Sequence, residues 1–147
     1  KNEIPNAKGL RFGIVVSKWN KEITDNLFDG AYNTLIECGA LTDDIIKYEV
    51  PGSFEIIFAA KKIAEKNIDV VICLGSIIKG ETKHFNFISQ AVTNGVKDLN
   101  ILLDVPVILG VLTDDNYRQA KDRSGGKYGN KGVEAAVTAI TMANLDR

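Results

Sequence analysis

The only histidine of the chain, His84, follows a short segment that could bind an anion. The segment runs Gly75-Ser-Ile-Ile-Lys-Gly80-Glu-Thr-Lys, comes directly after an apolar run, and leads into a helical pattern. At a strand–loop–helix junction, free backbone N–H groups and the positive end of the helix dipole attract anions. A histidine beside such a site can transfer protons near neutral pH. The sequence therefore predicts an enzyme that acts on a small phosphorylated molecule.

The spacing of Gly75 and Gly80 is close to that of a nucleotide-binding P-loop, but one residue excludes that function. Glu81 occupies the position of the lysine that neutralises the terminal phosphates, and a carboxylate there would repel a triphosphate. The loop could still hold a single phosphate through its backbone N–H groups. A plain strand-to-helix turn is the alternative.

Polar and aromatic residues also follow the ends of two other apolar runs. Trp19 could form a platform for a flat heterocycle, with the Asn20 amide beside it, or it could pack on Ile23 at the start of a helix. Ser53 is predicted as a helix N-cap with Glu55 in the first turn, which helix chemistry explains without a ligand. Spacing alone does not decide between these interpretations.

A basic loop precedes the last helical pattern. Arg123, Lys127 and Lys131 are interleaved with glycines, which is typical of a solvated loop and also of a phosphate clamp, because arginine can bind phosphate with two N–H groups. The sequence contains no zinc-ligand spacing, no dinucleotide GxGxxG motif and no Ser-His-Asp order.

The elements that must position these residues alternate between strand and helix. Apolar, β-rich runs cover residues 11–17, 45–50, 70–74 and 105–112, and the third is predicted to stop at Gly75. Helical spacing is found over residues 23–35, 54–65, 88–99 and 133–145, with a short segment over 115–122. The last helix is predicted to carry Val133, Val137, Ile140 and Leu145. This alternation predicts an α/β fold with a parallel sheet, whose ligands bind at the carboxyl ends of the strands.

Composition excludes several classes of protein. The 147 residues fit one domain, and 18 basic against 19 acidic residues give a net charge of −1, so no overall field attracts nucleic acid or an anionic membrane. No apolar stretch approaches the length of a bilayer span. Cys38 and Cys73 lack CxxC spacing and are typical of buried thiols in a reducing compartment, so we expect a cytoplasmic protein.

Four motifs in this order resemble the lumazine synthase family of riboflavin biosynthesis. They are Lys18-Trp-Asn20, Val50-Pro-Gly-Ser-Phe-Glu55, Gly75-Ser-Ile-Ile-Lys-Gly-Glu-Thr-Lys-His84 and Gly129-Asn-Lys-Gly132. The resemblance implies a flavodoxin-like, three-layer α/β/α sandwich with a central four-stranded parallel sheet over residues 10–147, preceded by an N-terminal arm over residues 1–9. It further implies a transferase that condenses 5-amino-6-(D-ribitylamino)uracil with 3,4-dihydroxy-2-butanone 4-phosphate. The products are 6,7-dimethyl-8-ribityllumazine, phosphate and water, and neither a metal nor an organic cofactor is implied.

The resemblance also implies roles for individual residues. His84 would be catalytic and move protons. The pyrimidine and its ribityl chain would contact Trp19, Asn20, Ser53, Phe54, Glu55, Ser76, Ile77, Ile78, Leu109 and Lys131. The butanone phosphate would contact Glu81, Thr82 and Arg123. Two positions depart from the family pattern, because Leu109 replaces a common phenylalanine and Lys79 replaces a common arginine. Losing the phenylalanine ring removes stacking worth ~1 kcal/mol.

An assembly is implied as well. In the resembled family a neighbouring subunit completes each site, five subunits form a ring, and twelve rings can close into an icosahedral capsid of sixty subunits. The arm with Ile4 and Pro5 would pair with the next subunit's sheet. Riboflavin synthase is a candidate partner. The alternatives are a non-catalytic flavin-binding or shell-forming homologue and a flavodoxin-like enzyme that acts on a phosphosugar.

Overall fold

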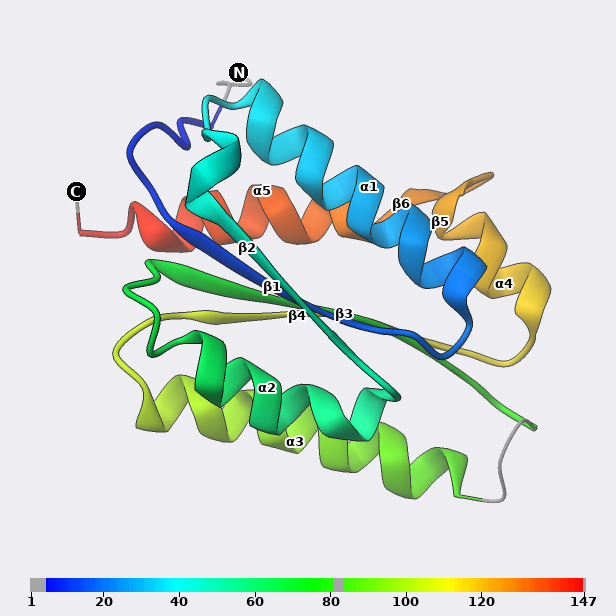
Figure 1. Ribbon diagram of the computed structural model, residues 1–147. Coiled ribbons are helices and arrows are strands. Elements are labelled where there is room, and N and C mark those ends of the chain that lie inside the picture. Colours follow the sequence, from blue (N-terminus) through cyan, green and yellow to red (C-terminus); the bar gives the residue numbers. More distant parts are fainter. Residues whose placement is uncertain (1–4, 81–83, 147) are drawn as a thin grey trace.

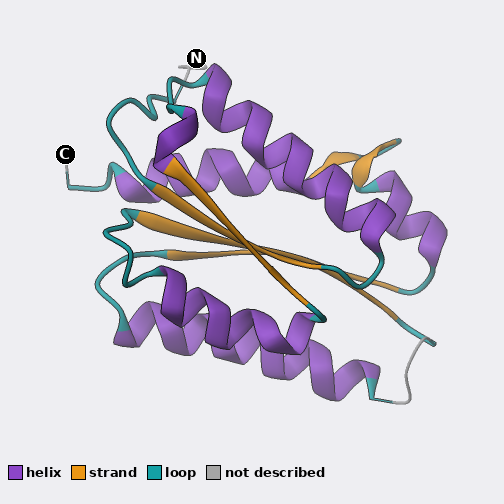
Figure 2. Ribbon diagram, in the orientation of Figure 1, coloured by secondary structure: helices purple, strands orange, loops and turns teal. Residues whose placement is uncertain are grey.

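Four parallel strands form the central sheet in the order β2–β1–β3–β4 (Figures 1 and 2). The computed structural model of the protein describes residues 5–80 and 84–146. The strands are β1 (Phe12–Ser17), β2 (Ile45–Val50), β3 (Val70–Ile78) and β4 (Val107–Asp114). All four run in one direction, so their carboxyl ends lie together, at the right of Figure 1.

Helices cover both faces of the sheet and make a three-layer sandwich. The upper layer in Figure 1 contains α1 (Lys21–Glu37), α4 (Tyr117–Asp122) and α5 (Lys131–Ala143). The lower layer contains α2 (Ile56–Ile63) and α3 (Phe85–Leu102). Short elements connect them: the 3₁₀ turns η1 (Thr42–Asp44) and η2 (Ser53–Glu55), and a small hairpin of β5 (Ser124–Gly126) and β6 (Gly129–Asn130). The predicted α/β sandwich with a four-stranded parallel sheet is confirmed.

Alternating side chains of the strands divide the interior into two cores. Ile14 and Val16 of β1 pack in the core beneath α1 and α5, whereas Val15 packs in the core against α2 and α3. This alternation follows from the period of two in a strand. It explains why the buried strands are apolar without interruption, since both faces are covered.

The predicted ends of one strand and one helix are wrong. β3 does not stop at Gly75 but continues through it to Ile78. In α5, Val133 and Val137 are each 38% exposed, and Leu145 lies beyond the end of the helix. The buried face of α5 carries small side chains instead: Gly132, Ala135, Ala136 and Ala139, together with Ile140. Gly132 lies close against α1, and Ala135 lies against Gly110 of β4, so both contacts need small residues.

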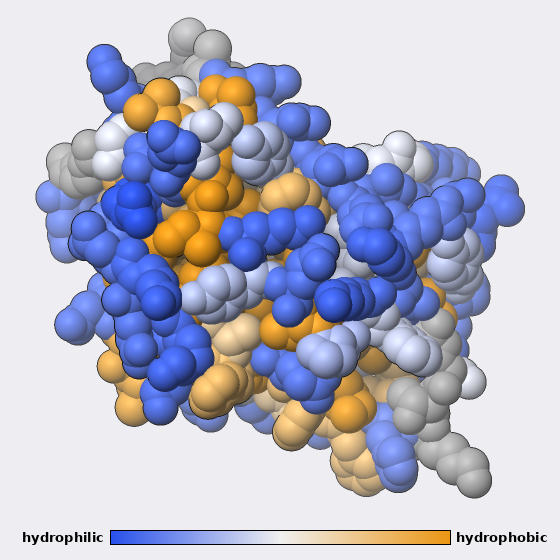
Figure 3. All heavy atoms as spheres, in the orientation of Figure 1, coloured by the Kyte–Doolittle hydropathy of each residue, from blue (hydrophilic) through white to orange (hydrophobic). Residues whose placement is uncertain are grey.

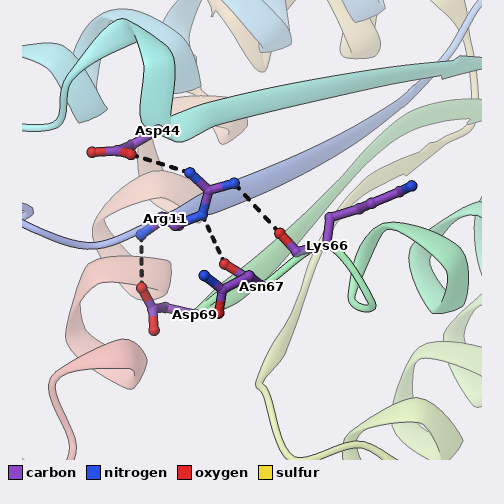
Figure 4. Close-up of polar contacts among 5 residues, drawn as sticks. All are labelled: Arg11, Asp44, Lys66, Asn67 and Asp69. Atoms are coloured by element: carbon purple, nitrogen blue, oxygen red, sulfur yellow. Dashed lines mark hydrogen bonds and ion pairs between the residues drawn. The ribbon is translucent and has the colours of Figure 1, made fainter.

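The opposite end of the sheet is held by Arg11 (Figure 4). Its backbone N–H donates to Asp69 at 2.7 Å, and its Nη1 lies 3.3 Å from Asp44. Its other side-chain nitrogens donate to the carbonyl oxygens of Lys66 and Asn67. Arg11 therefore joins the start of β1 to the segments that lead into β2 and β3, at the end of the sheet away from the strand carboxyl termini.

The described part of the N-terminal arm lies on its own chain. Ala7 is fully buried in the core, and its N–H donates to the carbonyl of Cys38 at 2.9 Å. Asn144 donates to the carbonyl of Asn6 at 3.0 Å. Residues 1–4, including Ile4, lie outside the described residues, so the pairing of the arm with a neighbouring subunit stays a prediction.

The motif Gly129-Asn-Lys-Gly132 fixes the start of α5 against α1. Asn130 caps α5 by accepting from the N–H of Gly132 at 2.7 Å, and its Nδ2 donates to the carbonyl of Asn26 at 3.0 Å. A Cβ added at Gly132 would lie 1.9 Å from the carbonyl oxygen of Leu27. A Cβ added at Gly30 would lie 2.6 Å from Asn130 Oδ1. The two glycines allow the helices to approach each other.

We therefore expect Gly132→Ala to destabilise the protein by about 2 kcal/mol or more, because a backbone carbonyl cannot move aside as a side chain can. The measurement is the free energy of unfolding in urea. Thr138→Ala, on the exposed face of the same helix, is the matched control and should change stability by less than about 0.5 kcal/mol. Equal effects of the two substitutions would contradict a close contact between the helices.

Candidate functional site

The carboxyl ends of β1 and β3 and the turn η2 surround a cavity of about 220 Å³, which we call the strand-end pocket. Its surface is largely apolar, as expected for a site that binds a flat organic ring. It brings together seven of the residues predicted to contact the pyrimidine and its ribityl chain. The lining residues are Trp19, Gly52, Ser53, Phe54, Glu55, Ser76, Ile77, Ile78 and Ile88.

Two aromatic side chains lie at the surface of this pocket. Trp19 is 59% exposed and Phe54 is 58% exposed, although both line the cavity. Ile23, the proposed packing partner of Trp19, is fully buried. The backbone N–H of Trp19 donates to the carbonyl of Pro51 at 3.1 Å, which fixes the loop after β1 against the loop after β2. An exposed ring on a fixed loop favours the interpretation of Trp19 as a stacking platform.

Asn20 ties this loop to β3. Its backbone is left-handed, with φ 58° and ψ 55°, a conformation that asparagine tolerates better than most residues. Its Nδ2 donates to the carbonyl oxygen of Ser76 at 3.0 Å. The Asn20 amide, predicted to contact the ribityl chain, thus also fixes the distance between the loop of Trp19 and the end of β3.

The turn η2 starts differently from the prediction. Gly52 is the N-cap, and its N–H donates to the carboxylate of Glu55 at 2.9 Å. The prediction that Ser53 is the N-cap is therefore wrong. Ser53 is instead buried beneath the turn, where its hydroxyl makes no hydrogen bond to any described residue. The carboxylate of Glu55 serves the turn as well as lining the pocket.

Gly75 is a packing residue and not part of an anion loop. It lies within β3, and a Cβ added there would be 2.8 Å from the Ser53 hydroxyl and 3.3 Å from the Ser17 hydroxyl. The absence of a side chain lets η2 lie directly on β3. The predicted loop from Gly75 to Gly80 is therefore wrong as far as Ile78, and only Lys79 and Gly80 form a turn, with φ 92° at Gly80.

His84 occupies the N-cap position of α3. Its imidazole is exposed and lies 6.0 Å from the ring of Phe87, measured between ring centroids. Its carbonyl accepts from the N–H of Ile88, which lines the strand-end pocket one turn further along. Glu81 and Thr82, predicted to bind the phosphate, lie outside the described residues.

The other predicted residues lie in different cavities. A cavity of about 310 Å³, which we call the basic pocket, is lined by Val111, Leu112, Thr113, Arg123, Tyr128, Lys131 and Glu134. A groove of about 880 Å³ runs along the edge of β4, and Leu109 and Lys131 line it. Neither cavity shares a lining residue with the strand-end pocket. Within one chain, Arg123, Lys131 and Leu109 are therefore not brought together with Trp19.

A buried carboxylate holds the arginine of the basic pocket. Arg123 Nη1 lies 2.6 Å from Asp114 Oδ1, and the Asp114 side chain has no exposed surface. Burial raises the pKa of Asp114 above its ordinary value, while the guanidinium of Arg123 acts in the opposite direction. Sequence reasoning did not name Asp114 as a site residue. Asp114 could have been predicted from its position at the carboxyl end of a strand, where ligands bind in a parallel sheet.

The described residues show neither a membrane helix nor a metal centre. No helix among them is long and apolar enough to cross a bilayer. No group of three or more metal-ligating side chains is found in the same part of the chain.

The protein is an open-sheet α/β protein of the kind that binds ligands at the carboxyl ends of its strands. An apolar, aromatic pocket and a separate basic pocket lie at that end of the sheet. A sequence model of the 6,7-dimethyl-8-ribityllumazine synthase family matches residues 9–147. The chain belongs to this family. A protein of that name from Flavobacterium johnsoniae is 57% identical over 99% of this chain and 77% of its own length. Others from Christiangramia forsetii and Parabacteroides distasonis are 54% and 50% identical, over 99% and 98% of this chain and 88% and 91% of their lengths.

The comparisons confirm the family and the function expected from the sequence. The chain is a transferase of riboflavin biosynthesis, and nothing in the comparisons supports the non-catalytic alternative.

Trp19 offers a direct test of the strand-end pocket, because the chain has no second tryptophan. A flavin or lumazine ring that stacks on it should quench its fluorescence in a saturable way. Phe54→Leu should weaken that binding about fivefold, since it removes the second ring of the pocket. Tyr32→Leu, which removes an aromatic ring on α1 outside the pocket, is the matched control. Unchanged emission at saturating ligand would contradict the platform role of Trp19.

Proposed function

We propose that this chain joins 5-amino-6-(D-ribitylamino)uracil to 3,4-dihydroxy-2-butanone 4-phosphate at a site completed by a second copy of the chain. One observation carries the proposal: the residues suited to a heterocycle and the residues suited to a phosphate line separate cavities of one chain. Each cavity is half of what the condensation needs. A neighbouring subunit that presents its basic pocket to the strand-end pocket would supply both halves.

The strand-end pocket would bind the pyrimidine. Trp19 stacks on the ring, and the ends of β3 at Ser76, Ile77 and Ile78 meet its edge. The ribityl chain, which is rich in hydroxyl groups, lies toward Asn20 and the turn η2. The unpartnered hydroxyl of Ser53 supports this assignment, because a buried hydroxyl without a partner is costly and a ligand hydroxyl would satisfy it.

The basic pocket would bind the phosphate of the second substrate. Arg123 supplies the fixed fork of N–H donors that phosphate recognition favours. Lys131 lines both the basic pocket and the β4 groove, so it can reach the ribityl end of the pyrimidine held by the neighbour. Leu109 borders the same groove and would cover the heterocycle from the far side. Backbone N–H groups at Glu81 and Thr82 would complete the phosphate site.

The chemistry requires orientation and proton transfer rather than a cofactor. An amine of the pyrimidine adds to the ketone, phosphate leaves, and a second amine–carbonyl condensation closes the ring with loss of water. Holding the two substrates together supplies most of the rate gain. His84 at the start of α3 moves the protons, a contribution of about 10²-fold or more.

An oligomer is required by this site, and the surface supports one. Large apolar side chains are exposed on the lower layer, among them Phe58, Phe87, Ile101 and Leu102, each more than two-thirds exposed. The face in Figure 3 shows apolar atoms along this layer and between the two helix layers. Exposed apolar surface of this kind marks protein interfaces. We propose a ring of five 16.0 kDa chains, about 80 kDa, with sixty chains, about 960 kDa, for a closed capsid.

We also propose a cellular compartment and a protein partner for the enzyme. We place it in the cytoplasm, where its two unpaired cysteines stay reduced. Riboflavin synthase, which would consume the product, is the proposed protein partner.

His84→Ala should lower kcat about 10²-fold and leave the pyrimidine KM nearly unchanged, because the histidine lies beside the strand-end pocket and not in it. The measurement is lumazine formation at pH 6 to 8 under saturating substrates. Residual activity is expected, since oriented substrates still react. A variant that keeps the wild-type rate across this range would contradict the proton-transfer role.

Arg123→Ala should raise the KM of the butanone phosphate at least tenfold, and the KM of the pyrimidine much less, because the charge-assisted contact is made to phosphate. Arg118→Ala, which removes the same charge from the exposed side of α4, is the matched control. Equal effects of Arg123→Ala on both substrates would overturn the assignment of the basic pocket.

A further inference from the structure

Asp114 holds Arg123 from inside the protein. The two side chains meet at 2.6 Å, with the carboxylate fully buried and the arginine 51% exposed. The second carboxylate oxygen, Oδ2, is also buried and makes no hydrogen bond to any described residue. A carboxylate in such a place carries a large desolvation cost, which its ion pair with Arg123 offsets. The contact therefore fixes the inner side of the guanidinium while its outer side lines the basic pocket.

The backbone of Arg123 is fixed as well. Its carbonyl accepts from the N–H of Lys131 at 2.8 Å, which joins the end of α4 to the start of α5. The helix α4 is tied to α1 through Glu22, whose carboxylate accepts from the Tyr117 hydroxyl and lies 3.8 Å from the ammonium of Lys121. With the backbone held by these contacts, the direction of the guanidinium depends on Asp114.

We propose that Asp114 is a positioning residue that sets the affinity of Arg123 for phosphate. The inference rests on the proposed phosphate role of Arg123. The carboxylate orients the arginine fork, and its negative charge opposes the attraction of the guanidinium for an anion. Inorganic phosphate leaves as a product in every turnover, so an arginine that held it too tightly would slow its release. Asp114 fixes the position of the Arg123 guanidinium and lowers its affinity for phosphate.

The test is Asp114→Asn, which keeps the shape and one acceptor oxygen but removes the charge. Inorganic phosphate is titrated into the assembled protein by calorimetry, and its Kd should fall about threefold to tenfold. Asp115→Asn is the matched control, because it removes the same charge one residue further on at an exposed position and should change the Kd less than about twofold. Structural damage would weaken phosphate binding, so tighter binding cannot be explained by it. A Kd that is unchanged or higher in Asp114→Asn overturns the inference.

Arg123→Ala separates this inference from the proposed function. If that variant binds phosphate as the wild type does, the phosphate role of Arg123 is itself wrong. If it loses binding while Asp114→Asn behaves like its control, the role of Asp114 alone is wrong.

Arg123→Lys tests the ion pair between Arg123 and Asp114 without altering Asp114. It is the second test if the Asp114→Asn protein does not fold. A lysine keeps the charge but lacks the fork that reaches the carboxylate and a phosphate at once. The phosphate Kd should rise about tenfold. A wild-type Kd in Arg123→Lys would show that charge alone suffices and would overturn the positioning role.

Discussion

The burial of β3 is the constraint on which the rest of the structure depends. All nine residues of β3 are buried, and the strand pairs with β1 on one side and with β4 on the other. Its length places Ser76 to Ile78 beyond the end of β1, where they can line the strand-end pocket. Its register with β4 places Ile78 beside Asp114, which holds Arg123. One central strand therefore positions residues of both pockets.

The fold also explains why each chain carries two half-sites. The strand-end pocket is built from loops on the side of α2 and α3, whereas the basic pocket is built from β4 and the segments around α4 and α5. Both lie near the carboxyl ends of the strands, as parallel sheets require. Arg123 nevertheless follows the last strand of the sheet, at the β4 edge, and Trp19 follows β1 in its interior. A second chain at that edge is the simplest way to join a phosphate site to a heterocycle site.

Much of this arrangement could be predicted from the sequence. The apolar runs located all four strands, three of them by the uninterrupted pattern of strands covered on both faces, whereas the edge strand β2 alternates. The motifs after the strands named seven of the nine residues that line the strand-end pocket, but only Arg123 and Lys131 of the basic pocket. The errors were at close contacts between elements. Gly75 looked like the end of a strand, but the glycine is needed because Ser53 and Ser17 approach it from neighbouring elements.

The buried face of α5 was missed for a related reason. Alanine and glycine face inward where α5 packs closely on α1 and β4, so the larger valines at 133 and 137, by which the sequence marks this helix, are partly exposed. Asp114 was missed because a single acidic residue after a strand resembles a solvated turn. Only the structure places it opposite Arg123 and out of water. Such contacts depend on distances between elements, which a one-dimensional pattern does not contain.

The central claim is that each active site combines the strand-end pocket of one chain with the basic pocket of another. The most direct test co-expresses the His84→Ala and Arg123→Ala chains, so that they assemble into mixed oligomers. Lumazine formation by these oligomers is then measured at a low concentration of the butanone phosphate. In randomly mixed rings about a quarter of the interfaces would pair two intact half-sites, so about a quarter of the wild-type activity should return. Activity no higher than the mean of the two separate variants would contradict a shared site.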